Sequence, residues 1–268
     1  MHVCVYEGKI IDMKNFCFTV DDNIRVFKEL TQGVYNSLFE HPYLRVYKRL
    51  HEKYRLKVQL NLFYQADEFD LSQMTERFQE EWRANAHWLK LSFHSRLENI
   101  KPYENAGYDE VFTDCQNVHR EIRRFAGDGL LGKTTTVHFC LATSEGLAAL
   151  QDNGVRGLLG LYGTQVEPRL SYQSTIAQGE RIRQGEIVES DGIAYAGIDI
   201  VLNCFDKEEI LWQLNALASH DLIKVMIHEQ DFYPDYPLYQ PDFEEKLDAT
   251  FAYLCHNGYQ SRLFEELL

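Results

Sequence analysis

The sequence has little positive charge and no long apolar run. Its 268 residues include 27 Lys and Arg against 41 Asp and Glu, a formal net charge of -14. Such a chain repels phosphates, so we expect neither nucleic acid nor an anionic membrane surface as a partner. No stretch is apolar for long enough to cross a bilayer, and residues 1–15 lack a basic head followed by an apolar run. A neutral sugar, a cation or a small metabolite fits this composition better.

Cysteine is absent from the patterns that would give it a structural role. None of the six cysteines forms a CxxC pair, and Cys17 and Cys140 lie in apolar, strand-like segments. This is typical of reduced, buried thiols, and it excludes a disulfide framework or a zinc knuckle. We therefore expect a cytoplasmic protein, whose oligomeric state the sequence leaves open.

The most informative stretch that is present is NFCFTVDDN, residues 15–23. It reads as a buried, β-prone strand that runs into Asp21 and Asp22. Neighbouring side chains of a regular strand point to opposite faces, so both carboxylates can serve one site only if the chain turns or bulges there. Asn23 tolerates such a turn. The alternative is that Asp22 or Asn23 only caps a helix over residues 24–31.

Strand-like and helix-like segments alternate about seven times, which predicts a parallel α/β architecture. The expected strands after the first are residues 57–64, 88–93, 133–142, 155–162, 197–203 and 222–227. The expected helices are residues 27–54 with a break at His41-Pro42, then 70–86, 109–125, 145–153, 206–219 and 241–256. Residues 163–192 have no clean period, and we interpret them as an inserted loop or hairpin region within a single domain, residues 1–268.

Ligand-type side chains follow strands that are far apart in the sequence: Asp21 and Asp22, then His94, and finally His228. A barrel builds its site from the carboxyl ends of several strands, whereas an open sheet gathers a site at one switch point. This favours a closed or nearly closed (β/α) barrel. Two imidazoles and a carboxylate can hold Zn²⁺ or a similar divalent metal, which lowers the pKa of water from about 15.7 towards roughly 7. Each histidine is alternatively a structural core residue.

These segments resemble the polysaccharide deacetylases of the chitooligosaccharide deacetylase homology type, which have a distorted (β/α) barrel and the motifs TFDDG, HSxxH, RxPY and LxLH. FTVDDN is similar to the first motif, FHSRLEN to the second and VMIH to the last. The resemblance implies Asp21 as the catalytic base, Asp22 and His94 as metal ligands, and His228 as the general acid. It also implies a distorted barrel of about seven parallel strands.

The chain departs from those motifs at two places. Glu98 stands where the second motif has its other histidine, and no RxPY is present, with His138 where its arginine would be. Both residues can bind zinc, and we favour His138 as the third ligand with Glu98 as the alternate. Without the arginine, Asp21 has no evident orienting partner.

Two residues near the last motif are candidates for substrate binding. Glu229 follows His228 directly and can hydrogen-bond into the site, although a solvated loop carboxylate is the alternative. Tyr233, with Phe232, Tyr236 and Tyr239, can form a stacking wall for a sugar ring, or simply pack over the barrel mouth.

Three functions follow from these residues. The first is a metal-dependent hydrolase that removes an acetyl group, from a non-peptide amide or an ester, on a carbohydrate-like or other small substrate. The second is a metal- or sugar-binding barrel without activity, which the missing histidine and arginine support. The third is a glycosidase; it needs two acids about 5–9 Å apart, with Asp199 or Glu229 as the second.

Overall fold

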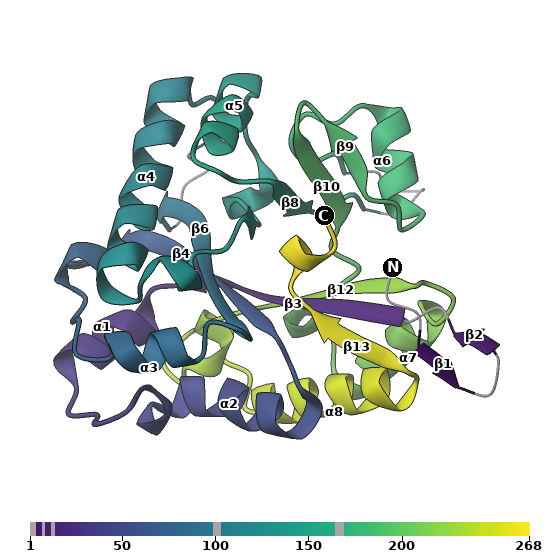
Figure 1. Ribbon diagram of the computed structural model, residues 1–268, viewed down its shortest axis with the longest axis horizontal. Helices are drawn as coiled ribbons and strands as arrows, with labels where there is room; N and C mark the ends of the chain where they lie inside the picture. Colours follow the sequence, from purple (N-terminus) through teal and green to yellow (C-terminus); the bar gives the residue numbers. More distant parts are fainter. Residues whose placement is uncertain (1–3, 7–8, 12–13, 99–102, 164–168) are drawn as a thin grey trace.

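The computed structural model describes residues 4–6, 9–11, 14–98, 103–163 and 169–268, and the long strand β3 (Lys14–Asn23) runs through its centre (Figure 1). β12 (Leu222–His228) pairs in parallel with β3 along most of its length. β13 (Tyr259–Arg262) pairs with the first part of β3, and β4 (Val58–Ala66) pairs with the last part. Parallel neighbours therefore surround the strand that ends in the Asp pair.

Two sheets together make the distorted barrel. The first sheet continues from β4 to β6 (Leu89–Leu97) and from β12 to β11 (Ile200–Val201), and β5 (Phe69–Asp70) folds back along the end of β4. The second sheet has four short strands in the order β7-β8-β10-β9. They are β7 (Thr134–Thr135), β8 (Gly157–Gly160), β10 (Ile193–Gly197) and β9 (Val188–Ser190).

The sheets meet at two joins. Leu91 of β6 bridges in parallel to Leu131, just before β7, and β10 leads directly into β11. If β10 and β11 are counted as one strand position, seven parallel strand positions follow one another around the barrel. Their order is β12, β3, β4, β6, β7, β8 and β10–β11. The predicted distorted (β/α) barrel is confirmed, with the pairing interrupted at the two joins.

Helices pack on the outer face of the sheets. Successive side chains of β3 point alternately outward, toward these helices, and inward, into the barrel. Phe16 and Phe18 face outward, where their rings lie 5.5 and 5.0 Å from the ring of Phe251. Cys17 faces the other way and packs with Leu159 of the second sheet. Because odd-numbered positions of β3 face inward, Asp21 points into the barrel.

The helices are bounded as follows: α1 (Arg25–Gln32), α2 (Pro42–Tyr54), α3 (Gln79–Ala84), α4 (Tyr108–Phe125), α5 (Ser144–Asp152), α6 (Ile176–Arg183), α7 (Lys207–Ala216) and α8 (Phe243–His256). A separate hairpin pairs β1 (Cys4–Tyr6) with β2 (Lys9–Ile11). Among the described residues, no helix has both the length and the apolar character needed to cross a membrane.

Some predicted elements are wrong in extent or type. The expected strand 133–142 stops at Thr135, and His138–Cys140 form a 3-10 turn in which Phe139 and Cys140 have positive φ angles of 60° and 57°. The expected helix 70–86 keeps α-helical geometry only in α3. The described part of residues 163–192 contains helix α6 and strand β9, and β9 forms a hairpin with β10, which begins at Ile193; that this region is an insertion stays a prediction. Strand β13 was not predicted at all.

Candidate metal centre and active site

A bulge at the end of β3 brings its two carboxylates to one site. The register between β3 and β4 shifts between Val20 and Asn23, and Asp22 has a positive φ of 64°. The Asn23 side-chain amide closes the bulge by donating to the carbonyls of Val20, Asp21 and Asn61. The turn that a shared site requires is therefore present.

Neither Asp22 nor Asn23 caps the following helix, because Glu229 does. Its Oε2 accepts hydrogen bonds from the backbone amides of Ile24 at 2.7 Å and Arg25 at 2.9 Å, and its Oε1 accepts from Val26 at 2.8 Å. A carboxylate satisfies the free N–H groups at a helix N-terminus and complements its dipole. Burial raises the pKa of Glu229 to about 7, against these three bonds, which lower it. Glu229 thus joins the end of β12 to α1, and its binding of substrate stays a prediction.

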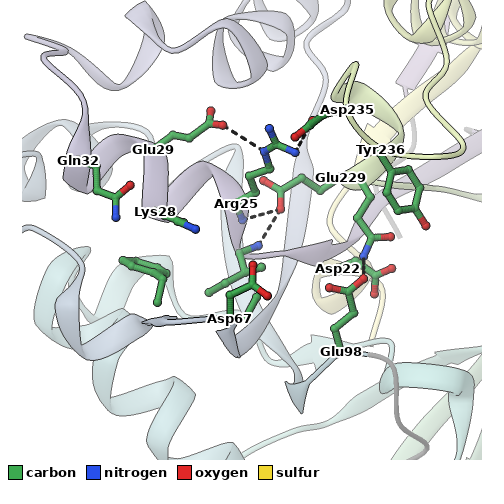
Figure 2. Close-up of a pocket in the computed structure, with 14 residues that line it drawn as sticks. Asp22, Arg25, Lys28, Glu29, Gln32, Asp67, Glu98, Glu229, Asp235 and Tyr236 are labelled. Carbon is green, nitrogen blue, oxygen red and sulfur yellow. Dashed lines mark hydrogen bonds and ion pairs between the residues drawn. The ribbon is translucent and has the colours of Figure 1, made fainter.

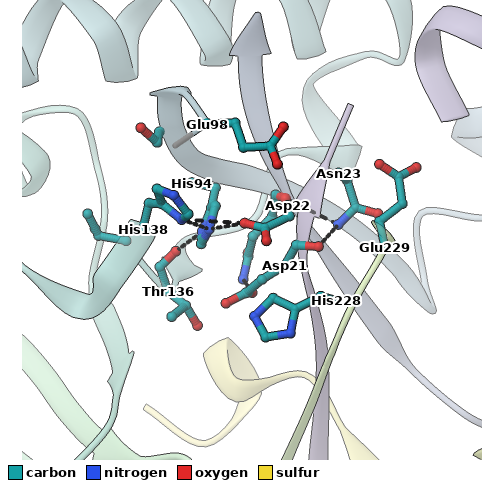
Figure 3. Close-up of polar contacts among 12 residues, drawn as sticks. Asp21, Asp22, Asn23, His94, Glu98, Thr136, His138, His228 and Glu229 are labelled. Atoms are coloured by element: carbon teal, nitrogen blue, oxygen red, sulfur yellow. Dashed lines mark hydrogen bonds and ion pairs between the residues drawn. The ribbon is translucent and has the colours of Figure 1, made fainter. Parts of the chain in front are cut away.

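Three side chains from three elements converge beside the bulge (Figure 3): Asp22 of β3, His94 of β6 and His138 of the 3-10 turn. His94 Nε2 lies 3.0 Å from Asp22 Oδ1 and 3.1 Å from His138 Nδ1. His138 Nδ1 lies 3.4 Å from Asp22 Oδ1. Ligands at about 2.0–2.2 Å from a tetrahedral zinc ion are themselves about 3.3–3.6 Å apart. The spacing of these three atoms is therefore close to that of three ligands of one metal ion.

The hydrogen bonding of His94 also leaves one ring nitrogen free to bind a metal cation. Its Nδ1 donates to the carbonyl of Thr136, so Nε2 presents a lone pair to Asp22 Oδ1. A backbone carbonyl on the far ring nitrogen is the usual support of a metal-binding histidine. Burial alone would raise the pKa of Asp22, but its contacts with His138 and His94 hold that pKa below its ordinary value. A lone pair and a carboxylate oxygen in contact need a proton or a metal between them.

Glu98 lies in the wall of the site and outside this group. Its Oε1 accepts a hydrogen bond from Gln230 Nε2 at 2.5 Å. Burial and the charges of Asp22 and Asp67 raise the pKa of Glu98. Among the described residues, Asp22, His94 and His138 form the metal-type cluster, and Glu98 borders the same cavity.

Asp21 and His228 lie opposite each other on β3 and β12, and both line a cavity of about 310 Å³ with the three metal-type residues. Asp21 is only 2% exposed, and burial raises the pKa of its carboxyl. His228 Nδ1 donates to Asn203 Oδ1 at 2.9 Å. The other ring nitrogen of His228 can then exchange a proton with a bound molecule.

Asn61 is the orienting partner of Asp21 that the sequence did not reveal. Its Nδ2 donates to Asp21 Oδ1 at 2.6 Å, and its Oδ1 accepts from Gln59 Nε2 at 2.8 Å. Gln59 Oε1 accepts in turn from Thr134 Oγ1 at 2.8 Å. All four residues are buried, so this relay fixes which end of the Asn61 amide meets Asp21. The sequence did contain one signal for this relay: Gln59 and Asn61 are amide side chains two positions apart in a mostly apolar strand, so they share one face of it.

A second cavity, of about 410 Å³, adjoins the first and shares Asp22, Glu98, Gln230 and Tyr236 with it. It extends along α1, with Lys28 and Gln32 in its wall (Figure 2).

Tyr233 lies to one side of these cavities. Its ring packs 3.9 Å from the Arg25 guanidinium and stacks near Tyr43, and the residue is 5% exposed. Tyr236 is the aromatic residue that lines both cavities. The predicted contact of Tyr233 with a sugar stays a prediction, and Tyr236 is the better placed of the two.

The acids that a glycosidase would need have other partners. The Asp199 carboxylate pairs with Lys224 Nζ at 2.8 Å, and that lysine is buried. Glu229 caps α1, as described above. Neither carboxylate is available to flank a glycosidic bond together with Asp21.

Comparison with known proteins gives matches in structure alone. No family model matches the chain, and no curated protein matches its sequence. The 4-alpha-glucanotransferase of Thermococcus litoralis matches 95% of this chain at a TM-score of 0.59 and 14% identity; the match spans 40% of that enzyme.

Two further structures also match 95% of this chain. The Bc1960 peptidoglycan N-acetylglucosamine deacetylase matches over 87% of its own length, with a TM-score of 0.50 and 11% identity. The Xyl-CE4 domain of a multidomain xylanase, from the hindgut metagenome of Trinervitermes trinervoides, matches over 89% of its length, with a TM-score of 0.48 and 13% identity. Identities this low speak for the fold alone. The match with the Bc1960 enzyme therefore shows that the chain shares the fold of that deacetylase, as its motifs predict.

Proposed function

We propose that this protein is a metal-dependent hydrolase that removes an acetyl group, from an amide or an ester, on a carbohydrate-like or other small substrate. The observation that carries the proposal is the convergence of Asp22, His94 and His138, with ligand atoms 3.0–3.4 Å apart, in the cavity that Asp21 and His228 also line. These five side chains supply a metal site, a base and an acid in one place.

Asp22, His94 and His138 would hold a divalent metal, with Zn²⁺ the best fit to two imidazoles and a carboxylate. When bound, the ion would polarise the acetyl carbonyl and lower the pKa of water from about 15.7 towards roughly 7. The Thr136 carbonyl keeps the His94 lone pair directed at the site.

Asp21 and His228 would move the protons. Asp21 Oδ1 is held by Asn61, and its carboxylate takes the proton of the attacking water. His228 is fixed through Nδ1 by Asn203, so Nε2 donates to the leaving nitrogen or oxygen. Acid and base thus come from neighbouring strands, β12 and β3.

The cavities support a small substrate. Their volumes, about 310 and 410 Å³, are each near the lower end of the range for small-molecule sites. The matched Bc1960 enzyme is a deacetylase of N-acetylglucosamine in peptidoglycan, which supports an acetylated sugar here. Among the described residues, Cys17, Cys115, Cys140, Cys204 and Cys255 are free thiols, which fits the proposed cytoplasmic location.

A second candidate is a barrel that binds metal or sugar without hydrolysis. It is supported by Glu98 in place of a motif histidine and by the absence of the RxPY arginine.

The two candidates differ in turnover. Purified protein loaded with Zn²⁺ would be tested on a panel of acetamido sugars and acetyl esters, beside Asp21→Asn and the control Asp109→Asn, at an exposed residue that lines neither cavity. We expect acetate release by the wild type and Asp109→Asn, and at least about a hundredfold less from Asp21→Asn. Metal binding without acetate release from any member of the panel would favour the binding protein.

A further inference from the structure

His138 reaches the metal site on a turn with an unusual backbone. Phe139 and Cys140, which follow it, both have positive φ angles, of 60° and 57°. Residues other than glycine, asparagine and aspartate seldom adopt this backbone conformation. One hydrogen bond closes the turn, from the amide of Cys140 to the carbonyl of Val137. A turn of this kind persists only where its surroundings hold it.

Tyr172 holds both ends of this turn. Its hydroxyl accepts from the amide of Val137 at 3.1 Å and donates to the carbonyl of Leu159 at 2.6 Å. Its own amide donates to the carbonyl of Cys140 at 3.2 Å. Tyr172 is 2% exposed, so these bonds are shielded from water. One residue therefore ties the turn to the end of β8.

The residues beside Tyr172 strengthen this attachment. Arg169 donates from its guanidinium to the carbonyl of Phe139 at 3.0 Å. Ser171 Oγ both accepts from the amide of Leu161, at 2.9 Å, and donates to its carbonyl, at 2.7 Å. Gly160 makes room for them, since a Cβ there would lie 2.7 Å from the Ser171 Cβ and 2.9 Å from the Tyr172 ring.

We propose that Arg169, Ser171 and Tyr172 form a clamp that positions His138 for metal binding. The clamp belongs to the region between β8 and α6, so this region contributes to the site through the backbone of the His138 turn. The metal in this inference rests on the proposed function, whereas the clamping of the turn does not. Tyr172 is accordingly a positioning residue, with no contact to substrate of its own.

The first test measures Zn²⁺ affinity by competition with a chromophoric chelator. Tyr172→Phe removes one oxygen and leaves the Val137 amide buried without its acceptor. We expect a loss of about 10- to 100-fold in affinity, the effect typical of the outer partners of metal ligands. Tyr162→Phe is the matched control, because it removes the same atom from a nearby buried tyrosine whose hydroxyl faces Ser174 at 3.4 Å. We expect it to stay within about twofold of the wild type.

A double-mutant cycle separates positioning from general stability. If the clamp acts through His138, Tyr172→Phe will have no further effect on Zn²⁺ affinity once His138→Ala is present. An equal loss in both backgrounds would overturn the proposal. Should Tyr172→Phe fail to fold, Arg169→Ala removes the bond to Phe139 at an exposed position and is expected to show the same dependence on His138.

Hydrogen exchange of the backbone amides tests the clamp without metal. In the metal-free protein, the amides of residues 137–141 should exchange faster in Tyr172→Phe than in the wild type, and Tyr162→Phe should leave them unchanged. Unchanged exchange in Tyr172→Phe would overturn the clamp. If the wild type binds no Zn²⁺ while exchange behaves as expected, the proposed function fails and the clamp stands.

Discussion

The two sheets of the barrel contribute to the site in different ways. The first sheet has long strands, and Asp21, Asp22, His94 and His228 stand at or near their carboxyl ends. The second sheet has strands of two to five residues, and its one metal-type residue, His138, comes from a strained turn beyond the end of β7. A long strand aims a side chain by its own periodicity, whereas a short strand needs support from residues distant in the sequence.

This difference predicts where the site is robust. In the first sheet, each candidate ligand is held by a ladder of backbone hydrogen bonds and by a packed core. In the second, the candidate ligand depends on a few bonds from the clamp. Four predictions test this difference between the sheets.

The largest effect is expected from Asp22→Asn, which removes the charged candidate ligand of the first sheet. The neutral amide no longer balances a dication between His94 and His138, so Zn²⁺ binding should be lost. Equilibrium dialysis followed by elemental analysis measures this. Asp67→Asn makes the same chemical change on an exposed residue near the site and should retain about one ion per chain. Retention of zinc by Asp22→Asn would contradict the site.

Phe251→Ala should lower the stability of the protein by removing packing between α8 and the outer face of β3. Phe251 is fully buried, and its ring packs on Phe16 and Phe18 of β3. We expect a loss of about 3–5 kcal/mol in the free energy of unfolding, measured by urea titration. Trp212→Ala, at a residue that is 68% exposed, should stay within about 0.5 kcal/mol of the wild type. A small effect of Phe251→Ala would show that this aromatic core does not hold β3.

Acid should destabilise the helix layer independently of the site. Burial, helped by the charge of Arg123, lowers the pKa of His119 on α4 to about 4, against roughly 6.5 in an unfolded chain. Between these values the unfolded chain binds a proton that the folded protein does not, so stability falls as the pH falls through this window. The contribution is about 3 kcal/mol. Urea titrations of the wild type and His119→Gln at pH 7 and pH 4.5 measure it, and equal losses in both proteins would exclude His119 as the cause.

The smallest effect is expected from the relay behind Asp21. Asn61→Asp keeps the shape of the side chain but replaces the N–H donor that orients Asp21 by a carboxyl group, so that two buried acids share one proton. We expect kcat to fall about 10- to 100-fold while the zinc content stays unchanged. Thr134→Val, two bonds further along the relay, should lower kcat only a few-fold. The control Asn257→Asp makes the same substitution at an exposed position, just after the last residue of α8. An equal loss of zinc and of kcat in Asn61→Asp would assign Asn61 to folding of the site instead.

The same contrast explains how much the sequence could predict. The stretch ending at Asp22, the strand ending near His94 and the strand ending at His228 were predictable because period and ending are local properties of the chain. The bulge followed from the requirement that two adjacent carboxylates share one site, and it is present. The parallel α/β architecture followed from the alternation of elements.

What was missed depends on contacts between distant segments. His138 was expected on a strand, but the backbone there is held by Tyr172 in another element. The cap of α1 comes from Glu229, which lies 203 to 205 positions away from its partners. The last strand, β13, pairs with β3 at the other end of the chain. No local pattern in the sequence marks any of these three contacts.

The most direct measurement is a crystal structure of the Zn²⁺-loaded protein with anomalous data at the zinc absorption edge. We predict one strong peak within about 2.0–2.2 Å of Asp22 Oδ1, His94 Nε2 and His138 Nδ1. The Tyr172 hydroxyl should remain bonded to the amide of Val137, as it is here. A peak ligated by Glu98 in place of His138, or no peak at all at these residues, would contradict the account.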